Sequence, residues 1–279
     1  MHLFPPDVCG RREEFCQRDS AFGQLYSDPR SRLATAEEAL EAMDAAGVGH
    51  AVALGFGWNE AGLCSHHNDY LSDVVRRHPQ RFSAFGAIQP RHSRQAVEEL
   101  VRFPRLGLAG IGELMPHLQG YELDGEAMAV VAEVAQATGL IVLTHTSEPV
   151  GHSYAGKGDV SPRSIVGLAD RFPSLRIVAA HWGGGLPFYS LMPEVARGLL
   201  NVYFDSAATT YLYRPEVYRV VVELVGADRV LFGSDFPLLR PGPMLRKVRA
   251  LALPDGALDL VLGGSAACLL GLGGPIDDR

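Results

Sequence analysis

Short apolar runs alternate with longer amphipathic segments along this chain. The runs are rich in β-branched and aromatic residues, which is typical of strands that are buried on both faces of a parallel sheet. We expect such strands at residues 48–56, 82–88, 106–114, 140–145, 175–181, 201–205 and 229–234. A further apolar start at residues 1–4 is ended by Pro5 and Pro6.

The amphipathic segments between these runs have the start and stop signals of helices. Thr35 and Glu38 have the spacing of a capping box, and Gly47 is the expected end of that helix. We expect further helices at residues 68–78, 93–103, 124–138, 162–172, 186–199, 216–225, 245–252 and 257–270. Residues 7–34 are polar without a clear period, so we expect a long loop there, with one helical turn near residues 11–18.

The alternation of strands and helices predicts a parallel sheet with right-handed crossovers. Strand and helix alternate about eight times without a break in composition. We therefore expect one domain over residues 1–279, an α/β fold of the (β/α)₈ TIM barrel type whose first strand is cut short at the N-terminus. A doubly wound nucleotide-binding fold is less well supported, because no GxGxxG follows the first strand and no P-loop is present.

Composition and charge exclude several classes of partner. With 47% hydrophobic residues the chain can form a substantial core. A net charge of -7 and the lack of a basic run argue against nucleic acid, and no apolar stretch approaches the ~18 residues of a membrane helix. Charged residues near the N-terminus argue against a signal peptide, and the cysteines form no CxxC pair. We expect a cytoplasmic protein with a small-molecule substrate, and the sequence leaves a homodimer open.

The predicted strands end in residues that can bind a metal or transfer a proton. These residues are His2, Glu113, His145, His181 and Asp235. Taken alone, each has an ordinary structural interpretation, such as a turn residue for Asp235. In a parallel barrel, however, the carboxyl ends of the strands form one ring, where barrel enzymes have their active sites. Imidazole and carboxylate together suit Zn²⁺, Mn²⁺ or Fe²⁺, and such an ion lowers the pKa of its water to about 7.

The motifs around these residues resemble those of a known family. They are His2-Leu-Phe-Pro-Pro, Gly110-Ile-Gly-Glu113, Thr144-His145, Ala180-His181-Trp-Gly-Gly-Gly and Phe232-Gly-Ser-Asp235-Phe-Pro. In this order they are similar to motifs of the amidohydrolase superfamily of metal-dependent TIM-barrel hydrolases. The resemblance is to the amidohydrolase-related branch, which also contains aminocarboxymuconate-semialdehyde decarboxylase. The segment Gly263-Gly-Ser265-Ala-Ala is similar to the closing motif of the family, with Ser265 where asparagine is usual.

The resemblance implies a role for each strand-end residue. His2, His145 and Asp235 would bind a divalent metal, with Zn²⁺ preferred and Mn²⁺ or Fe²⁺ as alternatives. Glu113 would be a fourth ligand in some branches of the family and not in others, and that choice stays open here. His181 would be the general acid or base, or a ligand of a second metal site, and Asp235 would also take a proton from the bound water.

The start of the chain departs from the family pattern. The first strand of the family carries His-x-His or Glu-x-His, and the second of these residues corresponds to His2. The first would precede Met1. We expect either that a longer natural chain supplies this ligand or that the protein lacks it.

The loops after the strands should determine specificity, because barrel scaffolds carry their binding residues on loops. We interpret Glu148 and His152, in the loop after residues 140–145, as substrate-binding residues. His117, just past Glu113, is a further candidate. Arg240 could hold a substrate carboxylate in a bidentate contact.

The reaction expected first is hydrolysis, in which a metal-activated water attacks the carbonyl of an amide, ester or lactone. One alternative is a non-oxidative decarboxylase of an unsaturated or aromatic carboxylic acid that uses the same residues. A second alternative is a metal-free, non-catalytic barrel, for which the missing first ligand is the evidence.

Overall fold

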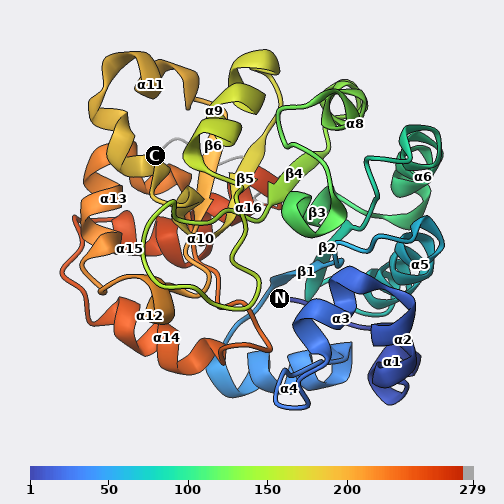
Figure 1. Ribbon diagram of the computed structural model, residues 1–279. Helices are drawn as coiled ribbons and strands as arrows, with labels where there is room; N and C mark the ends of the chain where they lie inside the picture. The colour runs from blue at the N-terminus through green and yellow to red at the C-terminus, as the bar shows by residue number, and fades with distance from the viewer. Residues whose placement is uncertain (273–279) are drawn as a thin grey trace.

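Seven parallel strands lie side by side in chain order and curve into a half-barrel (Figure 1). The structure is a computed structural model that describes residues 1–272. Within these residues the strands are β1 (Ala51–Leu54), β2 (Phe82–Gly86), β3 (Gly110–Leu114), β4 (Ile141–Thr144), β5 (Ile177–Ala179), β6 (Val202–Asp205) and β7 (Val230–Leu231). Each strand pairs in parallel with the next one.

The first barrel strand is reduced to a single residue pair. His2 forms a parallel bridge with Leu54 of β1. The amide of His2 also donates to the carbonyl of Phe236, which follows β7, at 2.7 Å. The segment around His2 therefore contacts both edges of the seven-stranded sheet, which confirms the predicted TIM barrel with a shortened first strand.

Helices cover the outer face of the sheet, as the alternating pattern predicts (Figure 1). The helices are α1 (Pro6–Gly10), α2 (Arg12–Arg18), α3 (Ser20–Tyr26), α4 (Ala36–Ala46), α5 (Ala61–Arg77), α6 (Ser93–Leu106), α7 (Pro116–Gln119), α8 (Glu126–Thr138), α9 (Pro162–Arg171), α10 (Ala180–Gly183), α11 (Pro193–Gly198), α12 (Thr209–Leu212), α13 (Val217–Val225), α14 (Pro241–Arg249), α15 (Ala257–Asp259) and α16 (Ser265–Leu270). The predicted capping box of Thr35 and Glu38 forms at α4, and Gly47 ends that helix with a left-handed φ of 68°.

The prediction of a loop over residues 7–34 is wrong, because α1, α2 and α3 occupy most of this segment. Helices this short show too little periodicity to be recognised among many charged residues. Each of them nevertheless buries apolar side chains against the barrel. These side chains belong to a separate core, the aromatic cluster, which includes Phe4, Phe15, Phe22, Phe56 and Trp58.

The predicted helix over residues 186–199 is also interrupted. A 3₁₀ helix, η1 (Leu186–Leu191), is followed by α11, which begins at Pro193. Proline disfavours the helical conformation for the residue before it, and Met192 is extended, with φ -88° and ψ 116°. Other boundaries shift in the same limited way: α5 begins at Ala61, and β7 ends at Leu231.

The main core lies between the sheet and the helices. Leu71 of α5, Phe82 of β2 and Phe103 of α6 are buried there. Every residue of β4 is buried, as expected for a strand that is covered on both faces. Among residues 1–272, no helix combines the length and the apolar character that crossing a membrane requires.

Candidate metal centre and active-site cavity

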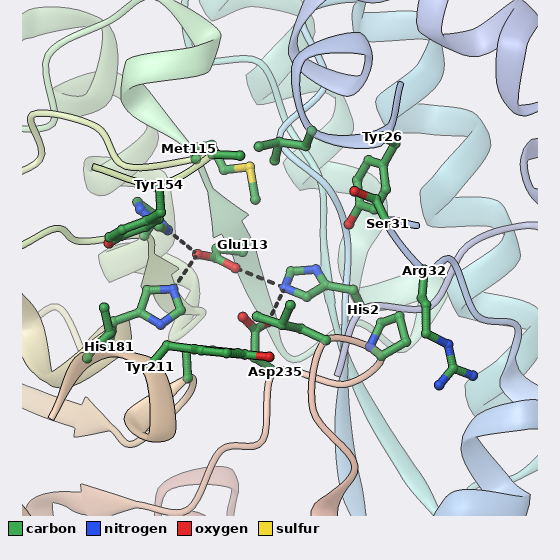
Figure 2. Close-up of a pocket in the computed structure, with 18 of the residues that line it drawn as sticks. His2, Tyr26, Ser31, Arg32, Glu113, Met115, Tyr154, His181, Tyr211 and Asp235 are labelled. Carbon is green, nitrogen blue, oxygen red and sulfur yellow. Dashed lines mark hydrogen bonds and ion pairs between the residues drawn. The ribbon is translucent and has the colours of Figure 1, made fainter. Parts of the chain in front are cut away.

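The structure brings the five strand-end residues together at the carboxyl end of the barrel, with Glu113 at their centre (Figure 2). Glu113 Oε2 lies 3.0 Å from His2 Nε2. Glu113 Oε1 lies 3.1 Å from His145 Nδ1 and 3.8 Å from His181 Nε2. Asp235 Oδ1 lies 3.3 Å from the same nitrogen of His2. We call these five residues the acid–histidine cluster.

Backbone contacts at the strand ends hold the cluster in place. The amide of Glu113 donates to the carbonyl of Gly55 at 3.0 Å, and the amide of His145 donates to the carbonyl of Leu114 at 2.8 Å. His181 and Asp235 both have a left-handed backbone, with φ values of 54° and 59°. This conformation costs a residue other than glycine about 1–3 kcal/mol, and it is found mainly where surrounding contacts enforce it, often at functional sites.

The cluster consists of ionised carboxylates around a protonated His2. Burial lowers the pKa of His2, but hydrogen bonds to Asp235 and Glu113 outweigh burial and raise the pKa to about 9. Burial raises the pKa of Glu113, but its contacts with His145 and His2 hold that pKa well below the usual range. The pKa of Asp235 is lowered as well, because the contact with His2 outweighs burial. The protonated His2 thus lies between two buried carboxylates and contacts both.

The donor atoms of the cluster fit a divalent metal ion. Glu113, His145 and His181 each offer one ligand atom, and these atoms lie within 4.8 Å of one another. His2 and Asp235 lie against Glu113 and extend the set. Among the described residues His2 Nδ1 is buried without a hydrogen-bond partner, so this ring still has a free donor or acceptor. Imidazole nitrogens and carboxylate oxygens together are ligands that Mn²⁺, Fe²⁺ and Zn²⁺ accept.

A cavity of about 350 Å³ opens onto the acid–histidine cluster. This volume lies in the range of small-molecule sites, roughly 300–1,000 Å³. Besides the cluster, its lining consists of Leu25, Tyr26, Ser31 and Arg32 from the N-terminal segment, His152, Tyr154, Ala155 and Gly156 from the loop after β4, and Met115, Ala208, Tyr211, Leu212, Pro237 and Leu238. The cavity is therefore largely apolar, with polar groups at a few defined places.

Of the four residues predicted to bind substrate, only His152 lines this cavity. His117 lies behind His145, with ring centroids 4.9 Å apart, and burial lowers the pKa of His117 to about 4. Glu148 is half-buried outside the lining, and Arg240 is exposed just before α14. These three side chains are thus not part of the cavity lining, and their role in substrate binding stays a prediction.

Sequence reasoning missed Tyr26, Ser31 and Arg32, because the segment that carries them was interpreted as a solvated loop. Phe22 and Tyr26 lie one helical turn apart, but a helix as short as α3 gives too little periodicity to be recognised from this spacing. Sequence reasoning also missed Asp205 at the end of β6. Asp205 Oδ1 accepts hydrogen bonds from the amides of Ala207 at 2.8 Å and His181 at 3.3 Å. Asp205 therefore stabilises the backbone of His181.

Comparisons with known proteins agree with this architecture. A family model described as amidohydrolase matches residues 10–272. The chain is 25% identical over 245 residues to 2-amino-3-carboxymuconate-6-semialdehyde decarboxylase of Dictyostelium discoideum, covering 75% of this chain and 67% of that protein. It is 24% identical over 213 residues to gamma-resorcylate decarboxylase of Polaromonas sp., covering 61% of this chain and 64% of that protein. The chain thus spans about two thirds of the length of these curated relatives.

Solved structures share the fold. The 5-carboxyvanillate decarboxylase of Sphingomonas paucimobilis has a TM-score of 0.80 at 20% identity, with 97% of each chain covered. A dihydroxybenzoic acid decarboxylase of Polaromonas sp. JS666, solved with bound manganese and the inhibitor 2-nitroresorcinol, has a TM-score of 0.76 at 18% identity, covering 97% of this chain and 95% of that one.

Proposed function

This chain belongs to the amidohydrolase family, and on that basis we propose that it is a metal-dependent, non-oxidative decarboxylase of an aromatic or unsaturated carboxylic acid. The similarity to two different decarboxylases over most of the chain carries this proposal. The reaction expected first from the sequence was hydrolysis of an amide, ester or lactone. That expectation is wrong, because the relatives of this chain are decarboxylases. The acid–histidine cluster argues against a metal-free barrel, because its imidazole nitrogens and carboxylate oxygens are donors that a divalent metal accepts.

We assign His2, Glu113, His145 and Asp235 as the residues that would hold the divalent ion. Mn²⁺ is preferred over the Zn²⁺ expected from the sequence, because manganese is bound in the dihydroxybenzoic acid decarboxylase of the same fold. When bound, such an ion supplies Lewis acidity, which draws electron density from a substrate oxygen.

His181 is assigned as the proton donor. Its Nε2 lies 3.8 Å from Glu113 Oε1. The ring nitrogens of His2 and His145 lie closer to the Glu113 carboxylate, at 3.0 and 3.1 Å, so His181 is the most distant of the three histidines. Its Nδ1 donates to the carbonyl of Ala207 at 3.3 Å, which turns Nε2 towards the cavity. Burial lowers the pKa of His181, but the charges of Glu113, Asp235 and Asp205 outweigh burial and raise it, which favours the protonated ring.

In the proposed reaction, the bond between the ring carbon and the carboxyl carbon breaks, and carbon dioxide leaves. The electron pair of that bond stays on the ring carbon, which takes the proton from His181 Nε2. Apolar walls from Met115, Leu212 and Leu238 suit a flat ring and limit the access of water to this carbon.

A direct test is to incubate the Mn²⁺-loaded protein with a panel of hydroxybenzoates and unsaturated diacids. We expect carbon dioxide and the shortened product in equal amounts. The His181→Asn variant should lose roughly 10²–10⁴-fold in turnover, as expected when a positioned acid is removed. His92→Asn, an exposed histidine outside the cavity, is the matched control. Absence of carbon dioxide across the panel, or full turnover by His181→Asn, would overturn the proposal.

A further inference from the structure

We propose that Tyr26 determines substrate specificity, by donating a hydrogen bond from its hydroxyl to a second oxygen substituent of the substrate, apart from the carboxylate that leaves. This inference rests on the proposed decarboxylase function and deepens it. It concerns which residue of this chain distinguishes acids that differ in this second substituent.

The position of Tyr26 in the cavity is the first observation. Tyr26 ends α3 and lines the cavity together with Ser31 and Arg32. Figure 2 shows Tyr26 and Ser31 on the side of His2, whereas Tyr154 and His181 lie on the other side of Glu113. A ring whose reacting carbon faces His181 therefore turns its far edge towards Tyr26.

The ring of Tyr26 is held rigidly by the aromatic cluster. It stacks on Phe22 with ring centroids 4.8 Å apart, and it meets the edges of Phe4 at 5.2 Å and Phe56 at 5.7 Å. Contacts on several sides leave the ring little freedom to rotate. The hydroxyl is therefore a preorganised donor, which binds a ligand at a low cost in conformational entropy.

Asp19 fixes α3, and so Tyr26, to the barrel. Asp19 Oδ1 accepts a hydrogen bond from the amide of Phe22 at 3.0 Å, at the start of α3. Its Oδ2 accepts from the amides of Asn59 at 2.7 Å and Glu60 at 3.1 Å, in the loop after β1. This buried carboxylate therefore fixes the position of α3 relative to the site.

The Tyr26 hydroxyl makes no hydrogen bond with the described residues 1–272, so it is free to bind a ligand in the cavity. Burial, together with the charges of Asp235 and Glu113, raises the pKa of Tyr26, so the group stays protonated and can donate. A ligand oxygen that accepts this proton would complete the site.

The neighbours of Tyr26 favour an acceptor with negative charge. Ser31 adds a second hydroxyl to the same side of the cavity. Arg32 is exposed at the rim and forms no ion pair with the described residues. The positive charge of Arg32 therefore favours an acceptor with negative charge on this side of the cavity.

The test measures binding rather than turnover. The Mn²⁺-loaded protein and its Tyr26→Phe variant are titrated calorimetrically with benzoate, the three hydroxybenzoates and benzene-1,3-dicarboxylate. We expect at least one oxygen-substituted probe to bind the unaltered protein more tightly than benzoate. Tyr26→Phe should weaken that probe about tenfold and leave benzoate unchanged, because only the hydroxyl is removed. If a hydroxybenzoate shows the larger loss of affinity, the acceptor is a ring hydroxyl. If the dicarboxylate shows it, the acceptor is a carboxylate.

Tyr189→Phe serves as the matched control, because Tyr189 is a half-exposed phenol on η1 outside the cavity lining. Its affinities should equal those of the unaltered protein. An equal loss for benzoate and the substituted probes, no loss for any probe, or no probe that binds more tightly than benzoate would overturn the proposal. Because no chemistry is needed for binding, this result is independent of whether the protein releases carbon dioxide.

Discussion

Glu113 Oε2 lies 3.0 Å from His2 Nε2, so a carboxylate from the end of β3 pairs with the histidine of the shortened first strand. The fold places an acid group from a different strand beside His2, and this acid contacts His145 as well. The proposed metal site is therefore built around Glu113.

Replacement of Glu113 tests this arrangement. The Glu113→Gln variant should bind Mn²⁺ at least roughly tenfold more weakly, because the amide lacks the charge that a divalent ion prefers. Titration with Mn²⁺, followed by electron paramagnetic resonance, measures the affinity directly. Glu126→Gln, an exposed carboxylate on α8, is the control and should leave the affinity unchanged. Equal affinities in Glu113→Gln and the unaltered protein would show that Glu113 is not a ligand.

Metal loading should release a proton from His2. The pKa of His2 is raised to about 9 in the metal-free protein, so this ring is protonated at pH 7.5 and must lose its proton to bind a metal. We expect about one proton per Mn²⁺ from His2 at that pH, and an affinity for Mn²⁺ that rises with pH until about 9. A pH-indicator dye in weakly buffered solution counts the protons. If His2→Ala released as many protons on loading as the unaltered protein, His2 would not be their source.

Buried His67 should make folding stability depend on pH. Trp58 Nε1 donates to His67 Nδ1 at 3.0 Å, and His67 Nε2 donates to the carbonyl of Leu3 at 2.6 Å, so the ring is neutral. Burial lowers the pKa of His67 to about 4, whereas an unfolded chain has the ordinary value of about 6.5. Below pH 6.5 His67 binds a proton in the unfolded state but stays neutral in the folded state. The contribution of His67 is therefore complete above pH 6.5 and is lost as the pH falls towards 4.

The size of this effect follows from linkage. Between pH 6.5 and 5 the free energy of unfolding should fall by roughly 2 kcal/mol because of His67 alone. Urea unfolding at several pH values measures it. His67→Gln, which keeps a donor for the Leu3 carbonyl but cannot be protonated, should show a shallower fall over this range. An identical pH dependence in both proteins would contradict the assignment.

Asn68 should be important for stability, because its side chain completes hydrogen bonds at the end of β2. The amide of Ala87 donates to Asn68 Oδ1 at 2.6 Å, and Asn68 Nδ2 donates to the Ala87 carbonyl at 2.8 Å. Asn68→Leu leaves both buried groups unpaired, so we expect a loss of about 2–4 kcal/mol in urea unfolding. Glu98→Gln, on an exposed face of α6, should change stability by less than about 0.5 kcal/mol. A comparably small change in Asn68→Leu would contradict this account.

The order of elements and the ring of strand-end residues were predictable from the sequence. Local patterns determine both: apolar runs predict strands such as β4, capping signals predict helices such as α4, and Glu113, His145 and Asp235 lie at the ends of predicted strands. Parallel alternation then restricts the topology to a barrel, whose strand ends meet at one place.

Only the tertiary structure decided which side chains line the cavity and which turn away from it. The interpretation of His117, Glu148 and Arg240 as substrate contacts rested on their distance along the chain from a strand end, whereas Tyr26 enters the cavity from far upstream. Its placement depends on Phe56 and on the bonds of Asp19 to Asn59 and Glu60, which join segments that are distant in sequence. Periodicity reflects the preferences of neighbouring residues, but it contains no information on contacts between elements. The sequence therefore determined the barrel and its candidate metal ligands, whereas the packing of α1–α3 decided the shape of the site.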